Sequence, residues 1–321
     1  TNAVFRDGGV SCGVCSPLMW SLYDFVWEDA LKGFLREIFL LRGDFRAGRL
    51  FFGRPYWNLG AVKQCLARLP GFVERDFDED LSVEIQYPGD GRTTPTNFFT
   101  VLRALPAIHA IGRVLRSQPK QTRRLLAEAS QITARYESMR ADAIEGFREL
   151  IETDYHRIES AYFRTIFATS LAKLDFTSTF PEADYPQLMA GLPRLRHIQS
   201  LRKLQTQVDA GETDLSSSLK NVRHHSSFGM DVCHPRWDED EDFVCNLIGR
   251  ARTATPSERH TVSYVEALAD TLRQIKVSKR KSFQTKLGRL RELVWLREEL
   301  RELSSQMYYL TRRYALAIAA D

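Results

Sequence analysis

The residues best suited to chemistry lie in one stretch of the chain, residues 223–244. It holds His224, His225 and His234 together with Asp231 and Arg236. A neutral imidazole can take a proton from a hydroxyl, and a carboxylate can fix its orientation. A planar guanidinium matches the geometry of a phosphate group. We therefore expect His224 to act as a general base oriented by Asp231, and Arg236 to bind a phosphoryl group. The alternative is that His224 is a structural hydrogen-bonding residue.

Two further arginines and two apolar residues are candidates for binding a substrate. Arg297 and Arg301 lie one turn apart on the last predicted helix and are candidates for the same phosphoryl group. The alternative is a solvated or salt-bridged face, since Glu298 is three residues before Arg301. Met19 and Trp20, at the start of the first predicted helix, are candidates for lining an apolar site for a bulky acceptor, or they simply pack in the core.

The cysteines give a weaker prediction of a zinc site. Cys12 and Cys15 have the CxxC spacing of zinc and redox proteins, but no second CxxC follows. Such a site would have to borrow His224, His225 or His234. Five cysteines, an odd number, in a chain without an export signal favour reduced thiols. We expect no metal in this chain.

Helices must position these residues, because apolar side chains recur every three or four positions along most of the chain. The sequence predicts a mainly α fold, a large helical domain of long packed helices with short extended segments and loops. The first helix is expected to follow residues 16–22, capped by Ser21 or Asp24. Residues 50–59 are predicted to be extended, and a short helix is predicted after Asn58.

A very long helix is predicted as the scaffold of the domain. Pro106 predicts a kink or break in a helix over residues 98–116, and Pro119 predicts the first turn of a helix that continues almost to Leu174. Gly146 and the pair at residues 153–154 are the points where it is expected to bend. Two further helices are predicted near residues 258–276 and 282–319.

Composition limits the classes of function. The chain has 321 residues, 43% of them hydrophobic and 27% charged, which is enough for a sizeable core. Its net charge of +4, from 45 basic and 41 acidic residues, is spread over the helices, so nucleic-acid binding is not favoured. We find no signal peptide and no uncharged apolar run of membrane-spanning length. The sequence therefore predicts a cytoplasmic protein with no nucleic-acid or membrane partner.

Four segments of the chain resemble, in the same order, the central domain of the phosphoenolpyruvate synthase-like and rifampicin phosphotransferase-like dikinases. They are an opening segment with Asn2, Ser16, Pro17, Leu18, Trp20, Ser21 and Leu22, the segment at residues 53–59, the pattern of His224, Asp231, Pro235, Arg236, Trp237 and Glu239, and the closing helix around residues 291–313. Together they cover nearly the whole chain.

The resemblance implies a domain that binds the acceptor in a phosphohistidine relay. In that family an ATP-grasp domain phosphorylates a histidine on a swivelling domain, which carries the phosphoryl group to an acceptor such as pyruvate or a rifamycin, giving AMP and phosphate. No histidine here has the Gly-Gly-x-x-Ser-His context of the relay, and no Gly-rich nucleotide loop followed by Lys is visible. The chain alone is expected to be inactive and to bind no cofactor. ATP and magnesium are implied for the complete enzyme.

The chain is expected to be part of a longer polypeptide, since it begins with Thr1 and opens directly on one of these segments. Its partners would be the ATP-grasp and swivelling domains of that polypeptide and a small-molecule acceptor. Residues 1–321 are expected to form a single domain, with a sub-boundary considered near residues 176–218. Arg223 and Gly229 depart from the family pattern and favour the alternative, a non-catalytic helical binding or interaction module.

Overall fold

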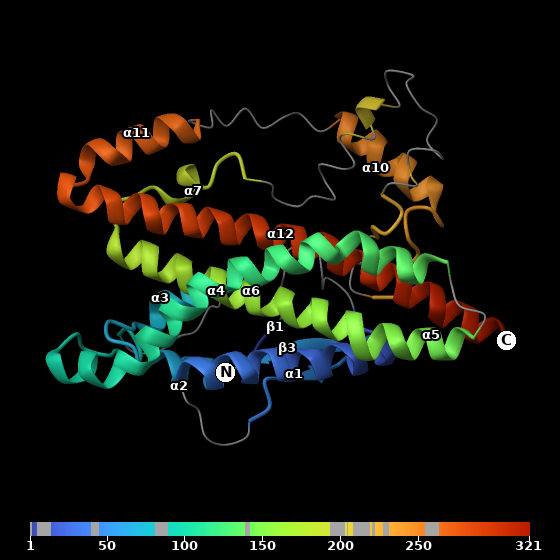
Figure 1. Cartoon of the computed structure of the whole chain (residues 1–321), viewed down its shortest axis with the longest axis horizontal. Coiled ribbons are helices and arrows are strands. Elements are labelled where there is room, and N and C mark those ends of the chain that lie inside the picture. The colour runs from blue at the N-terminus through green and yellow to red at the C-terminus, as the bar shows by residue number, and fades with distance from the viewer. Residues whose placement is uncertain are drawn as a thin grey trace. The chain divides into compact units, whose positions relative to one another are not determined.

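The computed structural model confirms a mainly α fold (Figure 1). It describes residues 2–4, 14–39, 45–80, 89–138, 142–192, 203, 205–207, 219, 222–226, 231–253 and 263–321. These residues fall into two compact units, one ending at Gln118 and the other running from Pro119 to Asp321. The sub-boundary considered near residues 176–218 falls largely outside the described residues.

The first unit is organised by helix α1 (Pro17–Phe39). Ser16 begins the helix, because its hydroxyl accepts a hydrogen bond from the backbone N–H of Met19 at 3.3 Å. The prediction of Ser21 or Asp24 as the cap is therefore wrong, and both lie inside the helix. One face of α1 is buried, with Trp27 and Phe34 among its large side chains.

A small antiparallel sheet follows the extended pattern predicted for residues 50–59. Strands β1 (Asn2–Val4), β2 (Gly48–Phe51) and β3 (Arg54–Asn58) are ordered β1-β3-β2. The tight turn between β2 and β3 is made by Phe52 and Gly53, both with positive φ. Asn58 then caps α2 (Leu59–Leu66), as predicted, by accepting from Ala61 N at 3.2 Å.

Helix α3 (Glu74–Asp80) completes the first unit around a buried cation. Lys63 on α2 is almost fully buried, and its Nζ lies 2.6 Å from Oδ2 of Asp78 and 3.1 Å from Oε1 of Glu74. Hydrogen bonding to the Arg92 backbone and to Lys63 lowers the pKa of Glu74. A buried ammonium requires such partners, so this ion pair fixes α3 against α2.

Helix α4 (Phe98–Glu137) runs through both units without interruption. The predicted break at Pro106 and the predicted new helix at Pro119 are wrong, because both prolines lie inside this one helix. By length and composition α4 is the one helix in the described ranges that is able to cross a membrane, and 28% of its most apolar window is buried.

In the second unit, the helix predicted to reach Leu174 ends early and reverses direction. After α4 ends at Glu137, Asp142 caps α5 (Ala143–Glu149) by accepting from Glu145 N at 3.0 Å. Thr122 on α4 then lies 3.1 Å from Thr165 on α6 (His156–Thr179), so the two helices pair antiparallel. The capping pattern at Asp142 was the sequence signal for this turn.

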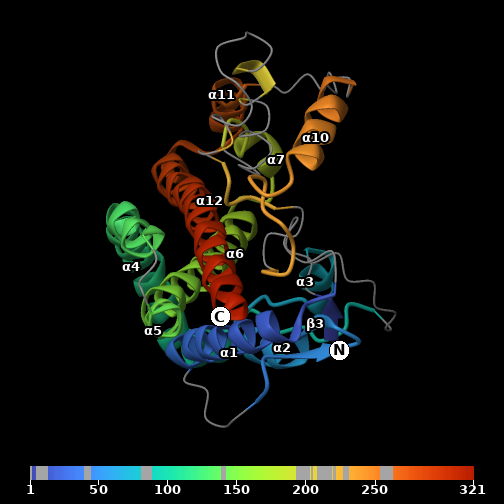
Figure 2. The same cartoon turned by 90° about the vertical axis from the view of Figure 1, so that its right-hand side faces the viewer.

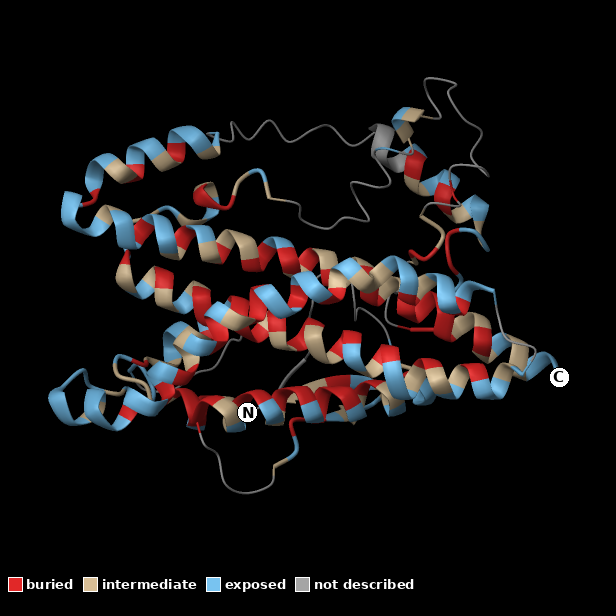
Figure 3. Cartoon of the chain, viewed as in Figure 1, coloured by how far each residue is buried: buried red, intermediate tan, exposed pale blue. Residues whose placement is uncertain are grey.

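The core of the second unit lies between α6 and the long helix α12 (Val277–Ala320). Figures 1 and 2 show the two helices side by side in both views. In Figure 3 the segments coloured as buried repeat along α12, with exposed residues between them, as expected for a helix with one face in the core. The smaller helices of this unit are α7 (Tyr185–Leu188), α10 (Glu241–Thr253) and α11 (Tyr264–Gln274).

Helix α5 packs closely against α12 at a glycine. A Cβ atom added to Gly146 would lie 2.6 Å from Cε1 of Tyr314, a fully buried side chain. We expect Gly146→Ala to destabilise the protein by about 1–3 kcal/mol despite the better helix propensity of alanine. Gly288→Ala, on an exposed position of α12 with open space around it, is the matched control and is expected to stabilise by about 0.5–1 kcal/mol. Urea denaturation of both variants checks this. Equal effects would contradict a close contact at Gly146.

Candidate functional site

The stretch that holds the predicted catalytic residues forms a compact turn structure in the second unit. An isolated antiparallel bridge pairs Ser226 with Arg236, and Trp237 N donates to His225 O at 3.0 Å. Trp237 is buried with Val244 and Ile248 in a small apolar cluster, which confirms its prediction as a core residue. The backbone that carries His224 and His225 is thus held by the Ser226–Arg236 bridge and by the hydrogen bond from Trp237.

His224 contacts a carboxylate from a distant part of the sequence. Its Nε2 lies 2.6 Å from Oε1 of Glu302 on α12, and both His224 and its neighbour His225 are buried. His225 Nε2 lies 3.7 Å from the same oxygen. Sequence reasoning missed Glu302, because it is one of several glutamates in a charged helix and no local spacing links it to a residue 78 positions earlier.

Asp231, predicted to orient His224, is buried and closes a local turn. Its Oδ1 accepts a hydrogen bond from Cys233 N at 2.9 Å, which is the geometry of an Asx turn. The carboxylate that hydrogen-bonds the imidazole of His224 is that of Glu302. The sequence analysis did not name Glu302 as a partner of His224, and the orienting role of Asp231 stays a prediction.

Arg236 is fully buried, with 0% of its surface exposed. Its guanidinium donates to the carbonyl oxygens of His224, at 3.5 Å, and Asp231, at 3.4 Å. Burial and the nearby charge of Arg312 lower its pKa to about 10, so it remains a cation at neutral pH. Its contacts hold the backbone of both predicted catalytic residues, which is a positioning role. Binding of a phosphoryl group by Arg236 stays a prediction.

Further arginines on α12 and in the turn structure surround this region. Arg312 Nη2 lies 2.8 Å from Oε2 of Glu239, and its Nη1 donates to Val232 O at 2.6 Å. Arg223 lies over the ring of Tyr309, 5.2 Å from its centroid. Arg312 and Arg223 were not among the predicted site residues, although both lie in segments that the sequence analysis singled out.

Tyr309 and Asp238 form a partly buried pair beside these arginines. The Tyr309 hydroxyl donates to Oδ2 of Asp238 at 3.2 Å. Burial raises the pKa of both groups, and the neighbouring carboxylate raises that of Tyr309 further. The pair connects the turn structure to α12 on the same face as Glu302.

The other predicted substrate-binding residues have partners of their own. Arg297 Nη2 lies 2.9 Å from Oε1 of Glu298, and Arg301 Nη1 lies 3.9 Å from Oε2 of the same buried carboxylate. These contacts match the alternative, a salt-bridged helix face. Met19 and Trp20 belong to the first unit, where Met19 is part of the core and the Trp20 ring lies 6.0 Å from that of Tyr23.

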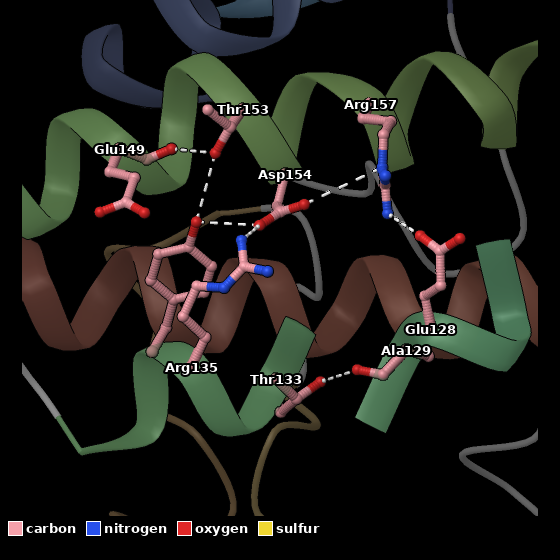
Figure 4. Close-up of polar contacts among 9 residues, drawn as sticks. Glu128, Ala129, Thr133, Arg135, Glu149, Thr153, Asp154 and Arg157 are labelled. Carbon is pink, nitrogen blue, oxygen red and sulfur yellow. Dashed lines mark hydrogen bonds and ion pairs between the residues drawn. The ribbon is translucent and has the colours of Figure 1, made fainter. Parts of the chain in front are cut away.

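A second polar network, shown in Figure 4, lies where α4 meets a π-helical turn, η1 (Leu150–Tyr155). Asp154 is buried, and its Oδ2 accepts from Arg135 Nη1 at 2.8 Å and from the Tyr136 hydroxyl at 2.9 Å. The Tyr136 hydroxyl also lies 3.2 Å from Thr153 Oγ1. A hydrogen bond to Tyr136 and the charge of Asp154 raise the pKa of Arg135. Sequence analysis identified residues 153–154 only as a point of bending.

Of the CxxC pair, Cys12 lies outside the described residues. Cys15 precedes α1, and its backbone N–H donates to Gly53 O at 2.7 Å.

No family model, no curated protein and no solved structure matches this chain.

Proposed function

We propose that this chain is the acceptor-binding domain of an ATP-dependent phosphotransferase, in which a phosphohistidine relay phosphorylates a hydroxylated compound such as a rifamycin, or pyruvate. The observation that carries the proposal is the 2.6 Å contact between His224 Nε2 and Glu302 Oε1. A histidine paired with a carboxylate is the usual arrangement of a general base and the group that orients it. It occurs within the segment that most resembles the dikinase central domain.

In this proposal the roles of the residues follow from their contacts. If Nε2 of His224 carries its proton toward Glu302, then Nδ1 is the basic atom that accepts the proton of the acceptor hydroxyl. Arg236 positions His224 through its carbonyl oxygen. Arg312 and Arg223 supply positive charge that attracts the incoming phosphoryl group. ATP and magnesium would be bound by the ATP-grasp domain.

Ligand binding by the purified chain tests the proposal. A ligand that binds only the folded state at 100 times its dissociation constant adds about 2.7 kcal/mol, which raises the Tm of a chain this large by about 5 °C. We expect a shift of this size with rifamycin SV, pyruvate or phosphoenolpyruvate, and its loss in His224→Gln. The matched control is His234→Gln, a half-buried histidine of the same segment, which should keep the shift. No shift with any of the three compounds would contradict the proposal.

A second candidate function, the helical interaction module, is favoured by one observation. The first turns of α4 expose large apolar side chains, with Phe98 and Phe99 at 73% and 78% exposure, and Leu102 and Leu105 are also exposed. Contiguous apolar surface of this kind marks interaction sites. Failure of the ligand screen together with self-association of the chain, lost in Phe98→Ser, would place this function ahead of the phosphotransferase.

A further inference from the structure

The two adjacent histidines and Glu302 form a group with the chemistry of a metal site. One imidazole nitrogen of His224, one of His225 and a carboxylate oxygen of Glu302 all lie within 4.8 Å of one another. The imidazole rings are 4.3 Å apart at their centroids. We propose that His224, His225 and Glu302 bind one divalent transition-metal ion, with zinc as the best-suited ion.

The distances fit a metal after small side-chain movements. Zinc bonds to histidine nitrogen and carboxylate oxygen are about 2.0–2.2 Å long, which places tetrahedral ligands about 3.3 Å apart. The present separations from Glu302 Oε1 are 2.6 Å for His224 and 3.7 Å for His225. To reach that spacing, the distance from His224 must increase by about 0.7 Å and the distance from His225 must decrease by about 0.4 Å, as expected when an ion replaces a hydrogen bond.

The ligand set also selects the class of ion. Two neutral imidazoles and one carboxylate are typical of zinc and of iron(II) sites, whereas magnesium and calcium prefer oxygen ligands. All three side chains are shielded from solvent, which limits competition from water. Three protein ligands leave a fourth position for water or a substrate hydroxyl, as in catalytic zinc sites.

The surroundings hold the ligands in place and balance the charge. The ring of His225 lies 4.8 Å from that of Trp237, and the carbonyl of His224 accepts from Arg236. Such supporting contacts fix the orientation of metal-binding histidines. Glu302 offsets one of the two positive charges of the ion. Arg312 on the same helix as Glu302 is held in an ion pair with Glu239.

The metal site is argued without reference to the phosphotransferase proposal. One consequence of the site, its effect on an acceptor hydroxyl, rests on that proposed function. A bound ion would occupy Nε2 of His224 and would itself lower the pKa of an acceptor hydroxyl at the open position. The metal-loaded domain would then deprotonate its acceptor through the ion, without His224 as a free base.

Titration of the metal-free chain with Co²⁺ and Zn²⁺ tests the site without any acceptor or donor domain. We expect one ion per chain, visible Co²⁺ absorption typical of four-coordinate geometry, and displacement of Co²⁺ by Zn²⁺. Glu302→Gln and His225→Ala should each weaken binding by about 100-fold or more, since even supporting residues of metal sites contribute 10–100-fold. Glu302→Gln preserves side-chain shape, and circular dichroism establishes that each variant is folded.

His234→Ala and Cys233→Ser are the matched controls. Both residues lie in the same turn structure, and both are of types that serve as zinc ligands. Both should bind the ion within about two-fold of the unaltered chain. Absence of saturable binding would overturn the site, as would binding that survives Glu302→Gln and His225→Ala but is lost in either control. The metal titration needs no acceptor, so it tests the metal site even if rifamycin SV, pyruvate and phosphoenolpyruvate all fail to bind.

Discussion

Replacing Arg236 with alanine is expected to lower the free energy of unfolding by about 3–5 kcal/mol. The guanidinium is fully buried and donates to the carbonyl oxygens of His224 and Asp231. Its removal leaves a cavity, removes donors from two backbone oxygens, and leaves the negative charge of Glu239 facing only Arg312. Urea denaturation at pH 7, followed by circular dichroism, measures the loss.

Two further variants separate the causes of this loss. Arg236→Met fills much of the same volume without a donor, so a smaller loss than in Arg236→Ala assigns the difference to the cavity. Arg124→Ala, at an exposed arginine of α4, controls for removal of positive charge and should stay within about 0.5 kcal/mol. A loss below about 1 kcal/mol in Arg236→Ala would contradict the positioning role, and with it the way in which the turn structure holds His224.

The second large effect is expected from Glu159, the fully buried carboxyl group between α6 and α12. Burial raises its pKa from 4.5 to about 7, although hydrogen bonds from Ser304 and Tyr308 oppose the shift. The folded state therefore holds this proton more tightly than the unfolded state does. The associated stability is fully present below pH 4.5 and is lost as the pH rises through about 7, and it amounts to about 3 kcal/mol.

Glu159→Gln tests this dependence, because the amide keeps the shape of the carboxyl group and cannot ionise. The unfolding free energy of the variant minus that of the unaltered chain should rise by about 3 kcal/mol between pH 4.5 and pH 8. Glu182→Gln, at an exposed carboxylate, is the matched control. A difference for Glu159→Gln that does not change with pH would show that Glu159 is ionised inside the folded protein.

Sequence periodicity predicted much of the fold, because helices and the hairpin are local structures. The apolar spacing located α1 and α12, and the Gly and Pro residues around position 53 located the extended segment. The long helix was wrong because apolar spacing persists through the turn after Glu137, where only the cap at Asp142 signals the end. Pro106 does not end a helix, because α4 continues through it, whereas the predicted alternative of a kink stays a prediction.

Only one of the two chain segments that form the candidate site could be predicted from the sequence. The segment with His224 and Arg236 stands out by composition, whereas its partner Glu302 lies on a helix rich in equivalent glutamates. Which glutamate faces His224 depends on how the turn structure meets α12, and this is set by long-range packing.

The π-helical turn η1 has a consequence for the register of the second unit. A π-helical turn accommodates one residue more than an α-helical turn, and each residue of an α-helix advances the side chains by about 100°. Residues before η1, such as Gly146, and residues after it, such as Glu159, both contact α12. If all six residues of Leu150–Tyr155 took regular α-helical geometry, everything downstream would rotate by about a quarter of a turn. Glu159 would then leave Tyr308, so the apparent irregularity is the insertion that keeps two stretches of one helix in phase with the same neighbour.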